Sequence, residues 1–173
     1  MTSTALILVD FEKEWVDPGS EYFVGDISDL IDRVNTLISF CRKHGCKIIF
    51  TTHIEKESEG PFTEASGNTD IIEDIAKQDS DILIKKHKIS PFYQTDLSKH
   101  LEGITGIVTC GILTNLCVRS LVQDAYDRDF EITIVEDCCK AFSDDIHKFT
   151  LSDIEDTREE VKVMKLHEFM TKV

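Results

Sequence analysis

The stretch GIVTCGILTNLCVRSLVQDAYDRDFEITIVED, residues 106–137, reads as one complete strand–helix–strand unit. The solid apolar run 106–111 predicts a buried strand, and 130–137 predicts a second strand beyond a helix at 115–128. Strands joined through a helix in this way run parallel, with a right-handed crossover. The unit therefore predicts a parallel sheet covered by helices.

The same alternation continues in both directions along the chain. Further strands are predicted at 5–10, 46–53, 81–86 and 159–166, and further helices at 28–44, 70–76, 96–103, 144–154 and 167–173. Asp26 or Ser28 can cap the first of these helices, and Gly45 can end it. This order predicts a three-layer α/β/α fold. Its doubly wound, Rossmann-like sheet has six mostly parallel strands in the order 3-2-1-4-5-6.

Length and charge limit the number of domains and the classes of partner expected for this chain. The chain has 173 residues, 41% of them hydrophobic, which is enough for one core, and we expect a single domain over residues 1–173. A formal net charge of −14 argues against nucleic acid and anionic membranes as partners and favours a small-molecule substrate. Without a signal peptide or an apolar run of about 20 residues, a cytoplasmic location is expected.

The six cysteines, at positions 41, 46, 110, 117, 138 and 139, are expected to be reduced in such a chain. They form no C-x-x-C pair, and no Cys/His cluster has the spacing of a zinc site. A structural zinc is therefore not expected.

Polar residues follow several of the predicted strands. Asp10 follows the first strand, Lys85 and Lys86 end the third, and Cys117 follows the fourth. Each has an ordinary interpretation on its own, as a helix cap, a solvated lysine or a packed thiol. Ligands of open parallel sheets bind beyond the carboxyl ends of the strands, where the strand order reverses. Convergence on that crevice makes Asp10, Lys86 and Cys117 candidate catalytic residues.

Three segments carry a resemblance to a known superfamily. ALILVDFEKEW (5–15), IKKHKISPFYQTDL (84–97) and VTCGILTNLCVRSLVQDAYDRDFEITIVEDCC (108–139) resemble the signature segments of the isochorismatase-like cysteine hydrolases, which include nicotinamidases and N-carbamoylsarcosine amidases. The resemblance implies a catalytic triad of Asp10, Lys86 and Cys117. Lys86 has the family's distance from the SPF turn, whereas Lys85 is a fallback and Lys88 a weaker one.

The resemblance also implies a reaction. It predicts hydrolysis of a C–N bond in an amide, carbamoyl or ureido compound through a thioester on Cys117. A helix start and the Lys86 ammonium are expected to favour the thiolate, while Asp10 takes the proton and returns it. The N–H groups of Leu113 and Cys117 would form the oxyanion hole, beside a non-proline cis peptide at Ile112–Leu113.

Candidate substrate contacts are Trp15, His53, Phe92 and Tyr93, each of which has ordinary packing as its alternative. Nicotinamidases hold a metal with an aspartate and two histidines after the second strand, and this chain offers only His53 there. We therefore expect no metal and no cofactor, which makes nicotinamide a poor candidate substrate.

Other functions remain open at this stage. True isochorismatases cleave a vinyl ether and typically lack the nucleophilic cysteine, so Cys117 favours amide-type cleavage. A catalytically idle member could serve as a scaffold. A nucleotide- or flavin-binding domain is disfavoured because the chain has no G-x-G-x-x-G or Walker A motif. The resemblance further implies a homo-oligomer, a dimer or tetramer whose neighbouring chains help to close the pocket.

Overall fold

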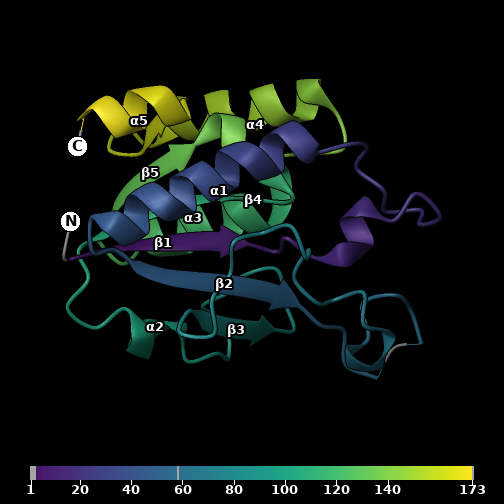
Figure 1. The fold of residues 1–173 in the computed structure, drawn as a ribbon. Coiled ribbons are helices and arrows are strands. Elements are labelled where there is room, and N and C mark those ends of the chain that lie inside the picture. Colours follow the sequence, from purple (N-terminus) through teal and green to yellow (C-terminus); the bar gives the residue numbers. More distant parts are fainter. Residues whose placement is uncertain (1–2, 58, 173) are drawn as a thin grey trace.

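The computed structural model describes residues 3–57 and 59–172, which form a six-stranded sheet (Figure 1). Its strands are β1 (Thr4–Val9), β2 (Lys47–His53), β3 (Ile82–Lys86), β4 (Gly106–Gly111), β5 (Glu131–Val135) and β6 (Lys162–Met164). The strand order is β3-β2-β1-β4-β5-β6, and each neighbouring pair is parallel. The predicted order is confirmed, and the order reverses between β1 and β4.

Helices cover both faces of the sheet. They are α1 (Ser28–Lys43), α2 (Leu97–His100), α3 (Arg119–Tyr126), α4 (Asp144–Thr157) and α5 (Leu166–Lys172). The rings of Phe40 in α1 and Phe169 in α5 lie 5.7 Å apart, so these two helices pack together. In Figure 1, α3 lies behind the sheet and α1 in front of it. Within the described residues, no helix has both the length and the apolar character needed to cross a membrane.

Helix α1 forms where its capping residue and apolar spacing predict it. The Asp26 carboxylate accepts a hydrogen bond from the Ser28 N–H at 2.9 Å, and Gly45 follows the helix with φ +75°. Buried side chains recur every three or four residues, namely Leu30, Ile31, Val34, Leu37, Ile38 and Cys41. The apolar stripe therefore holds α1 against the sheet.

Strand β1 lies at the centre of the core. Leu6, Ile7 and Leu8 are fully buried, because β2 and β4 flank the strand and helices cover both faces. Burying a side chain of this size contributes about 1.5–3 kcal/mol to the free energy of folding. Burial on both faces explains why the strand reads as a continuous apolar run rather than an alternating one.

The predicted helix at 70–76 is wrong. Ile71 instead forms an antiparallel bridge with Glu12, and the Asn35 side chain bonds to both the Asp74 carbonyl (2.7 Å) and the Ala76 N–H (2.8 Å). These partners from distant parts of the chain take up backbone groups that a short helix would have paired internally. The segment therefore folds as turns that contact Glu12 beyond the end of β1 and Asn35 in the middle of α1.

Candidate active site

The carboxyl end of β1 places Asp10 in a buried position. Its backbone adopts φ +54°, a left-handed conformation that aspartate tolerates better than most residues. The Asp10 N–H donates to the Thr51 carbonyl at 3.1 Å, and the Thr51 hydroxyl donates to Asp10 Oδ1 at 2.6 Å. Strand β2 therefore fixes both the backbone and the carboxylate of Asp10.

Gly111 lets the end of β4 approach the end of β1 closely. A Cβ atom at Gly111 would lie 2.3 Å from the Val9 carbonyl oxygen, and the residue has φ +155°. The next residue, Ile112, donates its N–H to the same carbonyl at 2.9 Å. The chain therefore leaves β4 directly beside Asp10, through an Ile112–Leu113 peptide that is cis, as predicted.

Cys117 lies in a π-helical turn, Thr114–Val118, that leads into α3. The sequence had predicted one continuous helix from 115. The Thr114 N–H donates to the Lys140 carbonyl at 2.8 Å, and the Thr114 hydroxyl is 2.9 Å from His147 Nδ1 in α4. These contacts tie the start of the turn to two neighbouring segments and so fix the position of the Cys117 thiol.

Lys86 at the end of β3 brings the three predicted triad residues together. Its Nζ lies 2.7 Å from Asp10 Oδ2 and 3.3 Å from Cys117 Sγ, and it also donates to the Lys88 carbonyl at 3.3 Å. Both Lys86 and Asp10 have no exposed side-chain surface. Cys117 is partly exposed, and it is the only one of the six cysteines that is not buried.

The other two lysines considered from the sequence lie elsewhere. Lys85 is exposed and pairs with Glu64 at 2.5 Å, because successive residues of a strand face opposite sides of the sheet. Lys88 is exposed and reaches the site only through its backbone carbonyl. The geometry therefore singles out Lys86.

The expectation that the site favours a Cys117 thiolate is wrong. Burial raises the pKa of the Cys117 thiol, the Asp10 carboxylate raises it further, and the Lys86 ammonium only partly opposes them. Burial alone would lower the pKa of Lys86, but Asp10 and Cys117 outweigh it and the pKa is raised. The resting site thus holds a thiol beside an ammonium–carboxylate pair.

A cavity of about 170 Å³ opens onto the sulfur. We call it the thiol cavity, and its lining residues are Asp10, Trp15, Tyr22, His53, Glu55, Phe62, Ile89, Leu113, Leu116 and Cys117. Trp15 and His53, two of the predicted substrate contacts, belong to this lining. The structure places the other two outside it: Phe92 packs against Phe130 under Arg128, and Tyr93 lines a neighbouring cavity.

Several lining residues escaped the sequence analysis. Tyr22 follows the 3-10 helix Lys13–Val16, while Glu55 and Phe62 lie in the loop after β2. They come together because the Glu55 N–H donates to the Phe62 carbonyl at 2.9 Å and the Phe62 ring stacks near Trp15. No short motif marks such loop contacts. The one signal that could have indicated them is the presence of aromatic residues in the loops that follow β1 and β2, two neighbouring strands.

The Leu113 backbone amide is available to a ligand. It has no hydrogen-bond acceptor within residues 3–57 and 59–172, although its neighbours Ile112 and Thr114 are both paired. Leu113 also lines the thiol cavity together with Cys117. An N–H group in this position can donate to a carbonyl oxygen whose carbon faces the sulfur.

Glu12 is a second buried carboxyl group close to Asp10. It is fully buried, and its Oε1 accepts a hydrogen bond from the His53 N–H at 2.7 Å. Burial, and then the nearby Asp10 carboxylate, raise the pKa of Glu12 well above its usual range. A protonated Glu12 adds no charge to the site while it joins the ends of β1 and β2.

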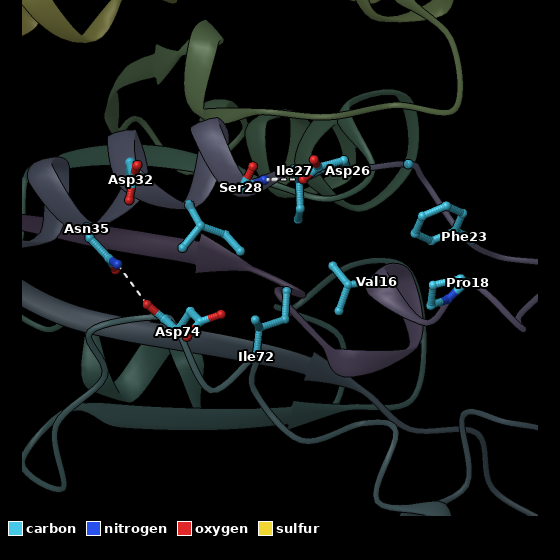
Figure 2. Close-up of a pocket in the computed structure, with 12 residues that line it drawn as sticks. Val16, Pro18, Phe23, Asp26, Ile27, Ser28, Asp32, Asn35, Ile72 and Asp74 are labelled. Atoms are coloured by element: carbon cyan, nitrogen blue, oxygen red, sulfur yellow. Dashed lines mark hydrogen bonds between the residues drawn. The ribbon is translucent and has the colours of Figure 1, made fainter.

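The largest cavity lies away from these groups. It measures about 620 Å³ and opens between the start of α1 and the 72–74 segment (Figure 2). Its walls include Ile27, Ile72, Asp26 and Asp74, and none of the triad residues. This large cavity holds neither a nucleophile nor a base paired to one. The thiol cavity is therefore the candidate active site.

Comparison with known proteins gives the family of this chain. The isochorismatase domain model matches residues 4–166. This chain belongs to the isochorismatase family. The Arabidopsis thaliana protein named "Probable inactive nicotinamidase" is 23% identical to this isochorismatase-family chain. The match covers 96% of this chain and 94% of the Arabidopsis protein. The ureidoacrylate amidohydrolase RutB of Methylobacterium radiotolerans is 24% identical over 88% of this chain and 73% of its own.

Solved structures of the isochorismatase fold superimpose closely. An isochorismatase-like hydrolase from Alkaliphilus metalliredigens has a TM-score of 0.87 at 20% identity, covering 98% of both chains. A Pyrococcus horikoshii pyrazinamidase in complex with zinc has a TM-score of 0.82 at 23% identity, covering 94% of this chain and 99% of its own. Across the described residues here, no three His, Cys, Asp or Glu side chains form a group that could hold a metal ion. The side chains present therefore do not fit a zinc site.

Proposed function

We propose that this isochorismatase-family chain is a cysteine-dependent hydrolase of small molecules. It cleaves an amide, carbamoyl or ureido C–N bond through a thioester on Cys117. The observation that supports this most strongly is one partly exposed thiol in contact with a fully buried Lys86–Asp10 ion pair. The sulfur faces a cavity of about 170 Å³, a size suited to a small substrate.

The first half of the reaction uses Asp10 as the base. Asp10 takes the thiol proton while the sulfur attacks the substrate carbonyl carbon, and the resulting oxyanion accepts hydrogen bonds from the N–H groups of Leu113 and Cys117. When the intermediate collapses, the C–N bond breaks and the nitrogen leaves as ammonia or an amine with the proton from Asp10. A thioester remains on Cys117.

The second half repeats these roles, with water as the nucleophile. Asp10 removes a proton from water, the hydroxide oxygen attacks the thioester carbon, and the C–S bond breaks. The sulfur recovers its proton from Asp10, and the acid is released. Lys86 stays an ammonium throughout, because its raised pKa keeps it charged, and so stabilises each anionic form of the sulfur.

Hydrolysis of a substrate panel tests the proposal. Small amides, carbamoyl compounds and ureido acids would be screened for release of ammonia or an amine. Cys117→Ala should lose at least about three orders of magnitude in rate on any substrate hydrolysed. Cys46→Ala serves as the matched control, because it removes a buried thiol far from the cavity. Equal rates in the Cys117→Ala and Cys46→Ala proteins would contradict the proposal, whereas no hydrolysis of any substrate by the wild type would favour an idle scaffold.

We further propose that the chain acts as a homo-oligomer. Leu116 and Phe142 are 44% and 50% exposed beside the thiol cavity, where a second copy could cover them. Apolar side chains grouped on a surface are typical of protein contacts. Sedimentation equilibrium should give a dimer or tetramer, whereas a monomer at micromolar concentration would contradict this.

A further inference from the structure

Three aromatic rings meet along one wall of the thiol cavity. The ring centroids of Trp15 and Phe62 are 5.2 Å apart, those of Tyr22 and Phe62 5.1 Å, and those of Trp15 and Tyr22 6.2 Å. The rings are inclined to each other by 50°, 73° and 89°, so their faces do not stack into a single plane. A cation that lies over the face of such a ring is attracted by the ring quadrupole.

The charge of the cavity favours the same kind of ligand. Asp10 is neutralised by Lys86, which leaves Glu55 as the one other charged residue in the lining. Glu55 forms no ion pair within the described residues, and burial lowers the pKa of the neighbouring His53, which keeps that ring neutral. An unpaired carboxylate therefore shares the cavity with the three rings.

Basic side chains lie in the next cavity and not in this one. Lys56, His87 and Lys88 line a space of about 440 Å³ that shares His53, Glu55 and Ile89 with the thiol cavity. Among the described residues, no arginine or lysine lines the thiol cavity, although the Lys86 ammonium contacts the Cys117 sulfur from outside this lining. A substrate small enough to occupy the thiol cavity alone would meet a carboxylate and aromatic faces, which disfavour an anion.

The geometry points to a substrate whose acyl part carries a positive charge: a small amide with an ammonium or quaternary ammonium group near its carbonyl. The cation would lie between the aromatic rings and Glu55 while the carbonyl faces Cys117. This inference rests on the proposed hydrolase function and specifies its substrate class.

A matched substrate pair tests the inference. Betaine amide and 3,3-dimethylbutanamide have the same shape, but the first carries a quaternary nitrogen where the second has a carbon. We expect kcat/KM to be at least tenfold higher for betaine amide. Glu55→Gln should reduce that ratio at least fivefold. The ammonium group also makes the carbonyl of betaine amide more reactive, whatever binds it. The test therefore rests on how much the ratio of the two kcat/KM values changes between the wild type and Glu55→Gln.

The control variant is Glu57→Gln, which makes the same change of charge on the same loop. Glu57 is exposed and lines neither cavity, so the ratio should stay within twofold of wild type. Two results would overturn the inference: an unchanged ratio in Glu55→Gln, or faster hydrolysis of the anionic amide succinamate than of betaine amide. Both leave hydrolysis by Cys117 intact.

A binding measurement separates this inference from the hydrolase proposal. Trp15 is the only tryptophan in the chain, so its fluorescence reports directly on the cavity. At constant ionic strength, choline should bind at least tenfold more tightly than its neutral analogue 3,3-dimethylbutan-1-ol, and Glu55→Gln should remove most of that difference. Equal affinities would overturn the cation site, whatever the hydrolysis results. Selective choline binding without any Cys117-dependent hydrolysis would support the site and contradict the hydrolase.

Discussion

Cys110 and Cys117 lie seven residues apart, at the end of β4 and just beyond it, and their surroundings differ sharply. Cys110 is fully buried in the sheet near Cys138 and Cys139, whereas Cys117 is partly exposed and contacts Lys86 at 3.3 Å. Burial raises the pKa of both thiols. A lowered pKa therefore does not mark the candidate nucleophile. What distinguishes Cys117 is a base, a cation and a cavity within reach of its sulfur.

The largest expected effect comes from removing the cation beside Cys117. Lys86→Met leaves Asp10 buried without its partner and should cost about 3–5 kcal/mol of folding free energy. Urea denaturation measures this change. Lys85→Met is the control, because its exposed pair with Glu64 contributes only about 0–1 kcal/mol. Equal stability losses for the two variants would show that the buried ion pair is not formed.

Serine substitutions compare the two thiols directly. Cys110→Ser buries a hydroxyl between apolar strands and should cost about 1–3 kcal/mol, because the new group is removed from water. Cys117→Ser should cost less than about 1 kcal/mol, since its position is polar and partly exposed. Thermal or urea unfolding of both variants gives the comparison, and the reverse order would contradict the assigned environments.

Alkylation rates test how accessible each cysteine thiol is and how its neighbours change its reactivity. Peptide mapping after brief treatment with iodoacetamide should find Cys117 modified at least about tenfold faster than any other cysteine, because the rest are buried. Asp10→Asn should speed this reaction, since the variant lacks the carboxylate that raises the pKa of the Cys117 thiol. If Cys46 or Cys41 reacts as fast as Cys117, or if Asp10→Asn leaves the rate unchanged, the surroundings assigned to Cys117 are wrong.

The smallest effect concerns Glu12. Because the folded state raises the pKa of Glu12, the folded protein holds a proton that the unfolded chain loses above about pH 4.5. The stability contribution of that proton is present at low pH and declines as pH rises through the window above 4.5. Glu12→Gln keeps the hydrogen bond from His53 and should gain stability relative to wild type as pH rises from 5 to 8. A difference that stays constant with pH would show that Glu12 does not titrate there.

Much of the sheet was predictable because buried parallel strands read as apolar runs and helices separate them. The alternation predicted a doubly wound parallel sheet, and the order 3-2-1-4-5-6, a common one for such sheets, is the order observed. With that order, the rule for strand ends predicted the positions of Asp10 and Cys117. The helix expected at 70–76 did not form, because Asn35 and Glu12 pair with that segment from distant parts of the chain. Long-range pairing of this kind leaves no local pattern.

The candidate site was predictable only in part, for the same reason. Lys86 could be preferred over Lys85 from its spacing to the SPF turn, and the alternation of β3 then buries one and exposes the other. The walls formed by Tyr22, Glu55 and Phe62 come from loops whose paths depend on tertiary contacts. The protonation of Cys117 also depends on burial, which a strand-end position does not specify.

Mass spectrometry of the protein, quenched during turnover of an amide that it hydrolyses, tests the thioester on Cys117 most directly. A thioester mechanism predicts an acyl adduct with the mass of the substrate minus its leaving amine, mapped to the peptide that contains Cys117. The same adduct should be missing when Cys117→Ala is quenched under identical conditions. Turnover that proceeds with the adduct on another residue, or at the wild-type rate in Cys117→Ala, would contradict a thioester mechanism.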